Sequence, residues 1–358
     1  MSGLHPIMLA PLSVLYGAAT RTRLTLYERG LLPISKLAAP VISVGNITTG
    51  GTGKTPLVEF VTRALALKGR KICVLTRGYG RENAGRRVVV SDGKNILADE
   101  AEAGDEPRLL AENLQGIAAI ISDADRFAAG QWAVENLGAE VFVLDDGFQH
   151  LRLARNLNIV AIDATRPWGE GHLLPWGHLR EPISGLARAD CVIITRADDM
   201  DGASALREEV ERLTPNKPIF SSQMAVRLIR KLEDNSIRDL PNQRLELAQP
   251  VAAFCGIGNP ASFSTQLKNA GYEAVCATFF PDHHRYNMVD VNNVVKQAKN
   301  AGAKSLVTTA KDAVKLRGFS FEIPCYVLEI GISIENEAQF LEMLWSTVSA
   351  ERFQYGAS

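Results

Sequence analysis

The stretch GNITTGGTGKTP at residues 45–56 carries residue types that could bind the phosphates of a nucleotide. Three of its glycines free backbone N–H groups to converge on an anion, whereas one glycine suffices for an ordinary turn. The usual phosphate-loop pattern begins with a glycine where this chain has Thr48. We nevertheless interpret the stretch as the binding loop of a nucleoside triphosphate, with a lysine for charge and a threonine hydroxyl for Mg²⁺. Its predicted binding residues are Thr48, Thr49, Gly50, Gly51, Thr52, Gly53, Lys54 and Thr55.

Two adjacent carboxylates follow an apolar run in VFVLDDGFQH, residues 141–150. A nucleotide-bound Mg²⁺ needs a carboxylate at the end of a neighbouring strand, and Asp145 and Asp146 stand at such a place. Consecutive strand residues face opposite sides, so we expect one of the two to face the metal or its water. Gln149 and His150 follow in the same predicted crevice. We interpret this segment as the Walker B element of the nucleotide site.

A second acidic pair and a histidine pair are ambiguous by themselves. Asp105 and Glu106 precede Pro107 at the expected start of a helix, where acidic residues usually cap the helix and complement its dipole. His283 and His284 lie on a loop after an apolar run, where histidines are more often solvated than catalytic. The residue types alone leave structural and catalytic roles open.

Apolar runs that alternate with helical patterns must position these side chains. The runs are continuous rather than alternating, which predicts strands buried on both faces and a parallel sheet covered by helices. We therefore expect a three-layer α/β domain of the P-loop NTPase type. The runs lie at residues 41–44, 71–80, 116–122, 139–147, 158–164 and 190–198.

A change of pattern at residues 219–250 divides the chain. Two polar strand-like pieces flank the turn-rich EDNSIRDLPNQ, which favours a linker, formed as a two-stranded hairpin. The α/β alternation then resumes. We predict a P-loop domain at 1–218 and a second, smaller α/β domain at 251–358, ending in a helix near 334–350.

The overall composition of the 358-residue chain restricts its partners. With 46% apolar residues and a formal charge of −1, it is globular and has no electrostatic basis for binding nucleic acid. Five cysteines are scattered without a C-x-x-C pair or a metal-ligand spacing. We expect buried thiols in a reducing compartment.

The amino-terminal stretch at residues 6–20 is almost entirely apolar and is followed by Arg21, Arg23 and Arg29. A helix of this length reaches about 22 Å and cannot cross a hydrocarbon core of about 30 Å. The basic residues follow the apolar part, unlike those of a secretory signal. Two interpretations stay open: the segment packs on the protein's own core, or it lies in a membrane surface with the arginines at anionic headgroups.

Several motifs in a fixed order resemble one family. Over residues 45–316 the chain contains GNITTGGTGKTP, LTRGYGR, GDEP, DDGFQH, GHLLPWGHLREP, GIGNPASF, FPDHH and TTAKDAVKL. This series closely resembles the tetraacyldisaccharide 4'-kinases of lipid A synthesis. The resemblance implies ATP-dependent phosphorylation of the 4'-hydroxyl of a lipid A disaccharide 1-phosphate precursor. It also implies a peripheral or monotopic position on the cytoplasmic face of the inner membrane, and we expect a monomer.

The resemblance also implies roles for single residues. Lys54 would neutralise the β- and γ-phosphates of ATP. Asp105 would accept the proton of the sugar hydroxyl, and His283, which directly follows Asp282, would orient or tune it. The residues implied as Mg²⁺ ligands are Thr55, Glu106, Asp145 and Asp146. The residues expected to bind the polar substrate head are Arg77, Arg81, Arg126, Gln149 and His150.

Two other functions compete with a kinase. A membrane-associated ATPase switch of the ParA type would also need the loop and the apolar amino terminus, but Thr49 replaces its signature lysine. A GTPase would carry an [NT]-K-x-D motif for guanine, and TRAD at residues 195–198 has Arg196 in place of the lysine. A titration that compares ATP with GTP would separate the GTPase from the kinase.

Overall fold

The computed structural model describes residues 6–79, 81, 83, 85–197, 203–232 and 247–349. Within these residues, the strands form a single twelve-stranded sheet in the order β10-β9-β11-β12-β8-β7-β6-β1-β5-β2-β4-β3. The strands are β1 (Val41–Gly45), β2 (Ile72–Thr76), β3 (Val88–Ser91), β4 (Ala118–Ser122), β5 (Val141–Asp145), β6 (Leu157–Asp163), β7 (Cys191–Thr195), β8 (Ile219–Lys231), β9 (Val251–Cys255), β10 (Ala274–Phe279), β11 (Ser305–Thr309) and β12 (Cys325–Ile334).

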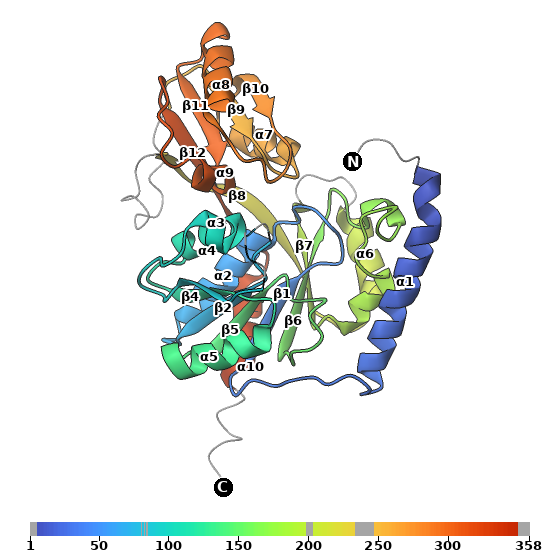
Figure 1. Ribbon diagram of the computed structural model, residues 1–358. Coiled ribbons are helices and arrows are strands. Elements are labelled where there is room, and N and C mark those ends of the chain that lie inside the picture. The colour runs from blue at the N-terminus through green and yellow to red at the C-terminus, as the bar shows by residue number, and fades with distance from the viewer. Residues whose placement is uncertain are drawn as a thin grey trace.

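The helices cover both faces of this sheet (Figure 1). The α-helices are α1 (Pro6–Glu28), α2 (Lys54–Ala66), α3 (Glu100–Ala103), α4 (Asp105–Asn113), α5 (Arg126–Leu137), α6 (Ala203–Leu213), α7 (Pro260–Asn269), α8 (Met288–Asn300), α9 (Ala310–Lys315) and α10 (Glu337–Ser349). Two short 3₁₀ helices are η1 (Gly169–Gly171) and η2 (Ile183–Arg188).

The first part of the sheet is parallel from β4 to β7 and is buried on both faces. Alternate residues of β1 enter different cores: Val41 packs with residues of α5, and Ile42 and Val44 pack with residues of α2. Only a strand covered on both sides needs such a continuous apolar run. The predicted three-layer α/β fold of the P-loop NTPase type is confirmed.

The second part of the sheet holds a smaller α/β unit, drawn in orange at the top of Figure 1. Its strands β10, β9, β11 and β12 are parallel. Phe263 of α7 belongs to the core on one face, and Val291 of α8 belongs to the core on the other face. The second, smaller α/β unit predicted from the sequence is therefore present in the fold.

The long strand β8 joins the two parts, because it pairs in parallel with β7 and antiparallel with β12. It occupies the beginning of the predicted linker, whose residues 233–246 lie outside the described part of the chain. The expected hairpin and the domain bounds therefore stay predictions. After β12 the chain returns to the first part, where Phe340 and Leu344 of α10 share a core with α2 and Trp345 Nε1 donates to the carbonyl of Ala64 at 3.0 Å.

Helix α1 lies along the outside of the first part (Figure 1). Its buried residues Ser13 and Gly17 face the protein, whereas Leu12, Val14 and Leu15 are 53%, 71% and 66% exposed. No described helix is long and apolar enough to span a bilayer. The helix thus packs on the protein along one face and exposes large apolar side chains on the other.

The five cysteines all lie in the described part of the chain and are free thiols. Cys276 is half-buried, and the other four are buried. The expectation of buried, unpaired thiols therefore holds for most of them.

Candidate active site

The predicted nucleotide loop connects the end of β1 to the start of α2. Gly53 caps the helix with a φ of 75°, a left-handed conformation that favours glycine. The side chain of Asn46 holds the loop from inside, since its Nδ2 donates to the carbonyl of Thr48 at 2.7 Å and to Thr52 Oγ1 at 3.0 Å. Asn46 was not predicted, although it stands inside the same motif. The backbone N–H groups at the start of α2 are thus available at a site that suits an anion.

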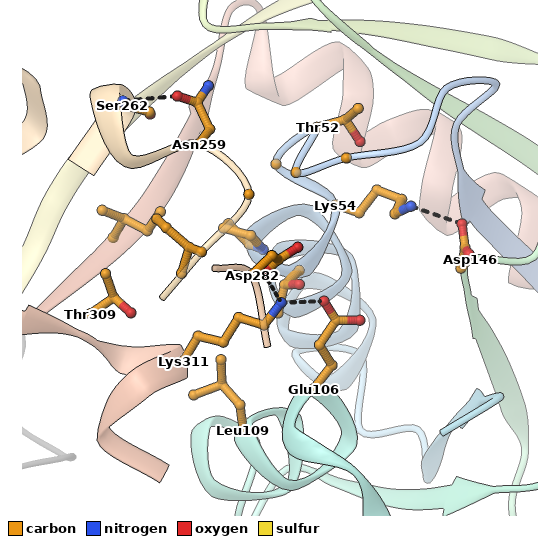
Figure 2. Close-up of a pocket in the computed structure, with 18 of the residues that line it drawn as sticks. Thr52, Lys54, Glu106, Leu109, Asp146, Asn259, Ser262, Asp282, Thr309 and Lys311 are labelled. Atoms are coloured by element: carbon orange, nitrogen blue, oxygen red, sulfur yellow. Dashed lines mark hydrogen bonds and ion pairs between the residues drawn. The ribbon is translucent and has the colours of Figure 1, made fainter. Parts of the chain in front are cut away.

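Lys54 lies at the centre of a charged cluster beside this loop (Figure 2). Its Nζ donates to Asn46 Oδ1 at 2.9 Å and to Asp146 Oδ1 at 2.8 Å. The other carboxylate oxygen of Asp146 accepts from Arg180 Nη1 at 2.6 Å. Burial opposes ionisation of Asp146, but the charges of Lys54 and Arg180 prevail and lower its pKa well below the usual range. Arg180 was not predicted as a site residue, although the motif GHLLPWGHLREP contains it.

Asp145 differs from its neighbour Asp146. It is buried, and its Oδ2 accepts a hydrogen bond from Thr76 Oγ1 at 3.0 Å. Burial and the negative charges of Glu106 and Asp146 raise the pKa of Asp145 to about 7. The charge of Lys54 is too weak to reverse this effect at Asp145.

This carboxylate group fits a divalent cation. Oxygen donors are the ligands that Mg²⁺ prefers, and a cation would counter both the burial and the repulsion that raise the pKa of Asp145. Within the described residues, no three His, Cys, Asp or Glu side chains form a metal site by themselves. Nucleotide enzymes usually bind Mg²⁺ through one or two carboxylates together with phosphates and water, so the donor set is compatible with that mode.

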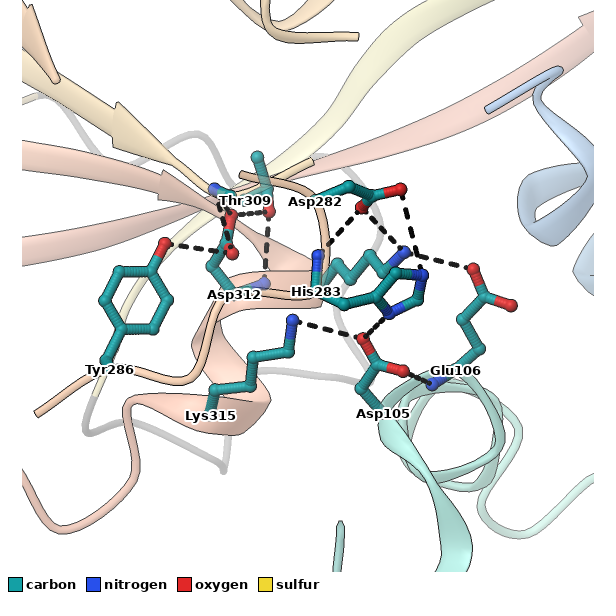
Figure 3. Close-up of polar contacts among 10 residues, drawn as sticks. Asp105, Glu106, Asp282, His283, Tyr286, Thr309, Asp312 and Lys315 are labelled. Carbon is teal, nitrogen blue, oxygen red and sulfur yellow. Dashed lines mark hydrogen bonds and ion pairs between the residues drawn. The ribbon is translucent and has the colours of Figure 1, made fainter. Parts of the chain in front are cut away.

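The second acidic pair meets the predicted histidine across the two parts of the sheet (Figure 3). Asp105 Oδ2 lies 2.9 Å from His283 Nδ1 and 3.1 Å from Lys315 Nζ. Asp105 is 6% exposed, and burial acts to raise its pKa, but the bond to His283 and the charges of Lys311 and Lys315 bring it well below the usual range. The same bond raises the pKa of His283.

Glu106 makes a parallel contact one residue further along α4. Lys311 Nζ lies 3.1 Å from Glu106 Oε1 and 3.4 Å from Asp282 Oδ1 (Figure 2). Although burial acts against the charged lysine, Glu106 and Asp105 raise the pKa of Lys311. Lys311 and Lys315 were not predicted as site residues, although both stand in TTAKDAVKL.

A fully buried carboxylate holds the loop that carries His283. Asp312 accepts hydrogen bonds from the backbone N–H of Gly256 at 3.1 Å, from Tyr286 Oη at 3.0 Å and from Thr309 Oγ1 at 2.6 Å (Figure 3). Three loops at the ends of strands are thereby tied to one side chain. Their common anchor fixes His283 relative to the smaller α/β unit.

A single cavity of about 840 Å³ joins these groups. The predicted nucleotide loop from Thr49 to Thr55, Asp145 at the end of β5, Asp146 and Glu106 line it on the side of the larger unit, whereas Thr48 does not. On the other side it is lined by His283 and Lys311, and by an apolar group that includes Ile257 and Phe263. Asp105 does not line the cavity, and lies behind His283. The cavity is large enough for a nucleotide, with its phosphates at the loop.

Comparisons with known proteins decide the family. A family model described as tetraacyldisaccharide-1-P 4'-kinase, LpxK, matches residues 5–349. The chain belongs to this family. A tetraacyldisaccharide 4'-kinase of Anaeromyxobacter dehalogenans is 42% identical over 313 residues, which cover 87% of this chain and 81% of that protein. The kinase of Desulfotalea psychrophila is 38% identical over 342 residues, 95% of this chain and 96% of its own.

A solved structure agrees with these relatives. The crystal structure of LpxK from Aquifex aeolicus in complex with ATP has a TM-score of 0.75 and 31% identity. The match covers 96% of this chain and 99% of that one. The family therefore accounts for nearly the whole fold, including the smaller α/β unit.

The predicted substrate-binding residues of this LpxK family member fall into two groups. Arg77 is exposed and lines the cavity, as does Gln149, whose Nε2 donates to the carbonyl of Asn46 at 2.8 Å. Arg81 and Arg126 are buried and do not line it. Arg81 Nη1 donates to the carbonyl of Ser122 at 2.8 Å, and Arg126 Nη1 donates to that of Ala124 at 3.2 Å.

His150 also lies outside the cavity lining and is half-buried. Burial and the charge of Arg126 lower its pKa to about 4, so His150 is neutral at neutral pH. A neutral imidazole cannot supply a positive charge to a phosphate. Of the five residues predicted to bind the substrate, Arg77 and Gln149 therefore line the cavity.

The TRAD motif at residues 195–198, weakly similar to a guanine-binding motif, makes hydrogen bonds to the nucleotide loop. Arg196 pairs with Asp163 and donates to the carbonyl of Gly51. Thr195 Oγ1 donates to the carbonyl of Thr52 at 3.0 Å. Asp198, the last residue of the motif, lies outside the described residues. The described part of the motif, at the end of β7, thus makes hydrogen bonds that hold the nucleotide loop.

Proposed function

We propose that this chain transfers the γ-phosphoryl group of ATP to the 4'-hydroxyl of a tetraacyl disaccharide 1-phosphate in lipid A biosynthesis. It is a kinase of the LpxK family. The observation that supports the proposal is that one cavity is lined both by the predicted nucleotide loop and by His283. Phosphoryl transfer needs such an arrangement, because an acceptor hydroxyl must lie in line with the phosphate and close to a proton acceptor.

The nucleotide half of the site supplies binding and charge. The loop N–H groups and Lys54 would bind the β- and γ-phosphates. Thr55, Glu106, Asp145 and Asp146 would hold Mg²⁺, which when bound spreads the negative charge of the phosphates. In the described arrangement Asp146 is paired with Lys54 and Arg180, which leaves Asp145 as the carboxylate with the greatest need for a cation.

The other half would accept the proton of the sugar hydroxyl. We assign this task to Asp105 and His283 as a unit, with His283 nearer the substrate because it lines the cavity while Asp105 lies behind it. If His283 Nδ1–H donates to Asp105, the ring nitrogen Nε2 is left as the acceptor, 3.7 Å from Asp282 Oδ2. The negative charge of Asp105 would then stabilise the protonated ring.

The lipid substrate suggests where the enzyme works. The exposed residues Leu12, Val14 and Leu15 on α1 form an apolar surface ahead of Arg21 and Arg23. Such a helix suits a membrane surface, with the arginines at anionic headgroups. We place the protein on the cytoplasmic face of the inner membrane, attached peripherally or monotopically, as a monomer.

Product analysis tests the function directly. The full chain is incubated with ATP, Mg²⁺ and a panel of acylated glucosamine disaccharide 1-phosphates, and the lipids are examined by mass spectrometry. The expected result is one added phosphate at the 4' position, lost in a matched reaction with Lys54→Ala. ATP hydrolysis without any phosphorylated lipid would favour the ParA-like ATPase switch instead.

A vesicle flotation experiment tests the membrane surface. Leu15→Glu on α1 should reduce binding to vesicles of phosphatidylethanolamine and phosphatidylglycerol. Leu67→Glu is a matched control, because Leu67 is 79% exposed at the end of α2, away from α1 in the sequence. Equal binding of both variants and the unmodified protein would contradict a membrane role for this face of α1.

A further inference from the structure

Helix α1 is connected to the nucleotide site by one segment, residues 173–180, which we call the connector. On one side, Ser13 Oγ donates to the carbonyl of Leu173 at 2.8 Å. Tyr16 Oη donates to the carbonyl of Arg180 at 2.8 Å. A side chain on Gly17 would lie only 2.7 Å from Leu173, so the helix and the connector are in close contact. Contacts therefore join the buried face of α1 to both ends of the connector.

On its other side the connector pairs with the nucleotide loop. The backbone N–H of Thr49 donates to the carbonyl of His178 at 2.7 Å, and Thr48 forms a β-bridge with Leu179. The N–H of Arg180 donates to the carbonyl of Ile47 at 2.8 Å. The start of the loop thus has the connector as its backbone partner.

Arg180 extends this link to the charged groups of the site. Its backbone carbonyl accepts from Tyr16, while its guanidinium donates to Asp146 Oδ2 at 2.6 Å. Asp146 in turn accepts from Lys54 Nζ at 2.8 Å. Three hydrogen bonds therefore lead from the side chain of Tyr16 to Lys54, the lysine of the proposed phosphate site.

The opposite face of α1 is the one that exposes Leu12, Val14 and Leu15. A lipid bound there would contact the same helix whose other face makes hydrogen bonds to the connector. We propose that Tyr16 is a positioning residue that couples attachment of α1 to a lipid surface with alignment of Arg180, Asp146 and Lys54 for nucleotide binding. The choice of a lipid surface rests on the proposed function. The coupling itself is measured as nucleotide affinity, which needs no phosphoryl transfer.

The test uses the full-length protein and the variant Tyr16→Phe, which keeps the ring and removes the hydroxyl donor. Tyr27→Phe is the matched control, since Tyr27 lies on the same helix and, within the described residues, makes no side-chain hydrogen bond to the connector. Affinity for the analogue AMP-PNP with Mg²⁺ is measured by calorimetry, with and without vesicles of phosphatidylethanolamine and phosphatidylglycerol.

We expect vesicles to tighten nucleotide binding of the unmodified protein and of Tyr27→Phe by about two- to tenfold, the range of one hydrogen bond. Tyr16→Phe should bind the vesicles equally well but show no tightening. In steady-state kinase assays its KM for ATP should rise by a similar factor, with an unchanged KM for the lipid acceptor. General damage to the fold would change both KM values, whereas a positioning role at the nucleotide loop changes only the KM for ATP.

A second variant guards against an effect of Tyr16→Phe on folding. Ser13→Ala removes the other side-chain contact with the connector and should also reduce the response to vesicles. The proposal is overturned if vesicles leave the nucleotide affinity of the unmodified protein unchanged, or if Tyr16→Phe keeps its full response. If no lipid is phosphorylated but the vesicle response follows Tyr16, the proposed function fails while the coupling stands.

Discussion

The two charged clusters of the site are built in different ways. Lys54, Asp146 and Arg180 all come from the larger α/β unit. Asp105 instead meets His283 and Lys315 of the smaller unit, and its partner His283 is 178 positions away in the sequence. One cluster therefore belongs to a single unit of the fold, whereas the other exists only while the two units lie close together.

The difference follows from the sheet. Strands β1 and β5 are direct neighbours, with Val44 opposite Asp145, so backbone hydrogen bonds hold the nucleotide loop beside the aspartates. Within the described residues, no such ladder joins α4 to the smaller unit. His283 on the loop after β10 makes a hydrogen bond with Asp105, and Lys311 and Lys315 of α9 make ion pairs with Glu106 and Asp105. We expect the first cluster to persist in any state of the protein and the second to depend on how the units are placed.

The largest expected effect is on the persistent cluster. Lys54→Ala removes the charge that would face the phosphates and should lower kcat/KM by about 10³- to 10⁵-fold, as expected for the loss of a cation at the transferring phosphoryl group. Steady-state kinase assays with the lipid acceptor measure it, with the exposed Lys94→Ala as the control. Near-normal turnover in Lys54→Ala would remove this cluster from the nucleotide site.

The next effect concerns the cluster between the units. Asp105→Ala and His283→Ala should each lower kcat by about 10²- to 10⁴-fold, with little change in ATP affinity. If the residues act as a unit, the double variant should be scarcely worse than the poorer single variant. Single-turnover kinetics of the three proteins measure this.

The neighbouring histidine supplies a control for this cycle. His284 Nε2 lies 3.0 Å from Asp290 Oδ2 within the smaller unit, so His284→Gln should stay close to full activity. Multiplicative losses in the double variant would mean that Asp105 and His283 have separate roles. A fully active His283→Ala protein would exclude it from the proton transfer.

A smaller effect is expected on stability at Asp145, one of the proposed metal ligands. Asp145 has a folded pKa of about 7 against an ordinary 3.8, so it ionises in the unfolded chain at a lower pH than in the folded one. Stability without metal therefore falls as the pH rises from about 4 to about 7, and the penalty then stays. Asp145→Asn should remove this penalty.

Thermal unfolding in the presence of a chelator measures this. Asp145→Asn should melt a few degrees above the unmodified protein at about pH 8, with the gap closing toward about pH 4. With Mg²⁺ and nucleotide the order should reverse, because the asparagine is a poorer ligand. A lower melting temperature for Asp145→Asn in chelator at about pH 8 would show that its charge is already compensated.

The smallest expected effects concern Arg77, which lines the cavity, and Arg81, which is buried. Arg77→Ala should raise the KM for the lipid acceptor by about three- to tenfold and leave the melting temperature unchanged, because Arg77 is exposed and lines the cavity. Arg81→Ala should instead lower the melting temperature and leave the KM for the lipid acceptor unchanged, since Arg81 is buried against Ser122. The same KM increase in both variants would place both arginines at the substrate.

Much of the larger unit could be predicted because its signals are local. A continuous apolar run such as 141–145 specifies a strand buried on both faces, and the glycines before Lys54 specify a loop that can close on an anion. The order of motifs identified the family and, by resemblance, the pairing of Asp105 with His283. These features need only neighbouring residues, or a pattern already known from relatives.

The tertiary structure decided which side chains share a space. Arg180, Lys311 and Lys315 stand in motifs that the sequence displays, but no local pattern assigns Arg180 to Asp146 or the lysines to α4. Arg77 and Arg81 stand four residues apart in the same motif, but in the fold Arg77 lines the cavity and Arg81 is buried. The physical reason is that charge pairing and burial depend on distance in space, and residues from distant strands come together only when the sheet has formed.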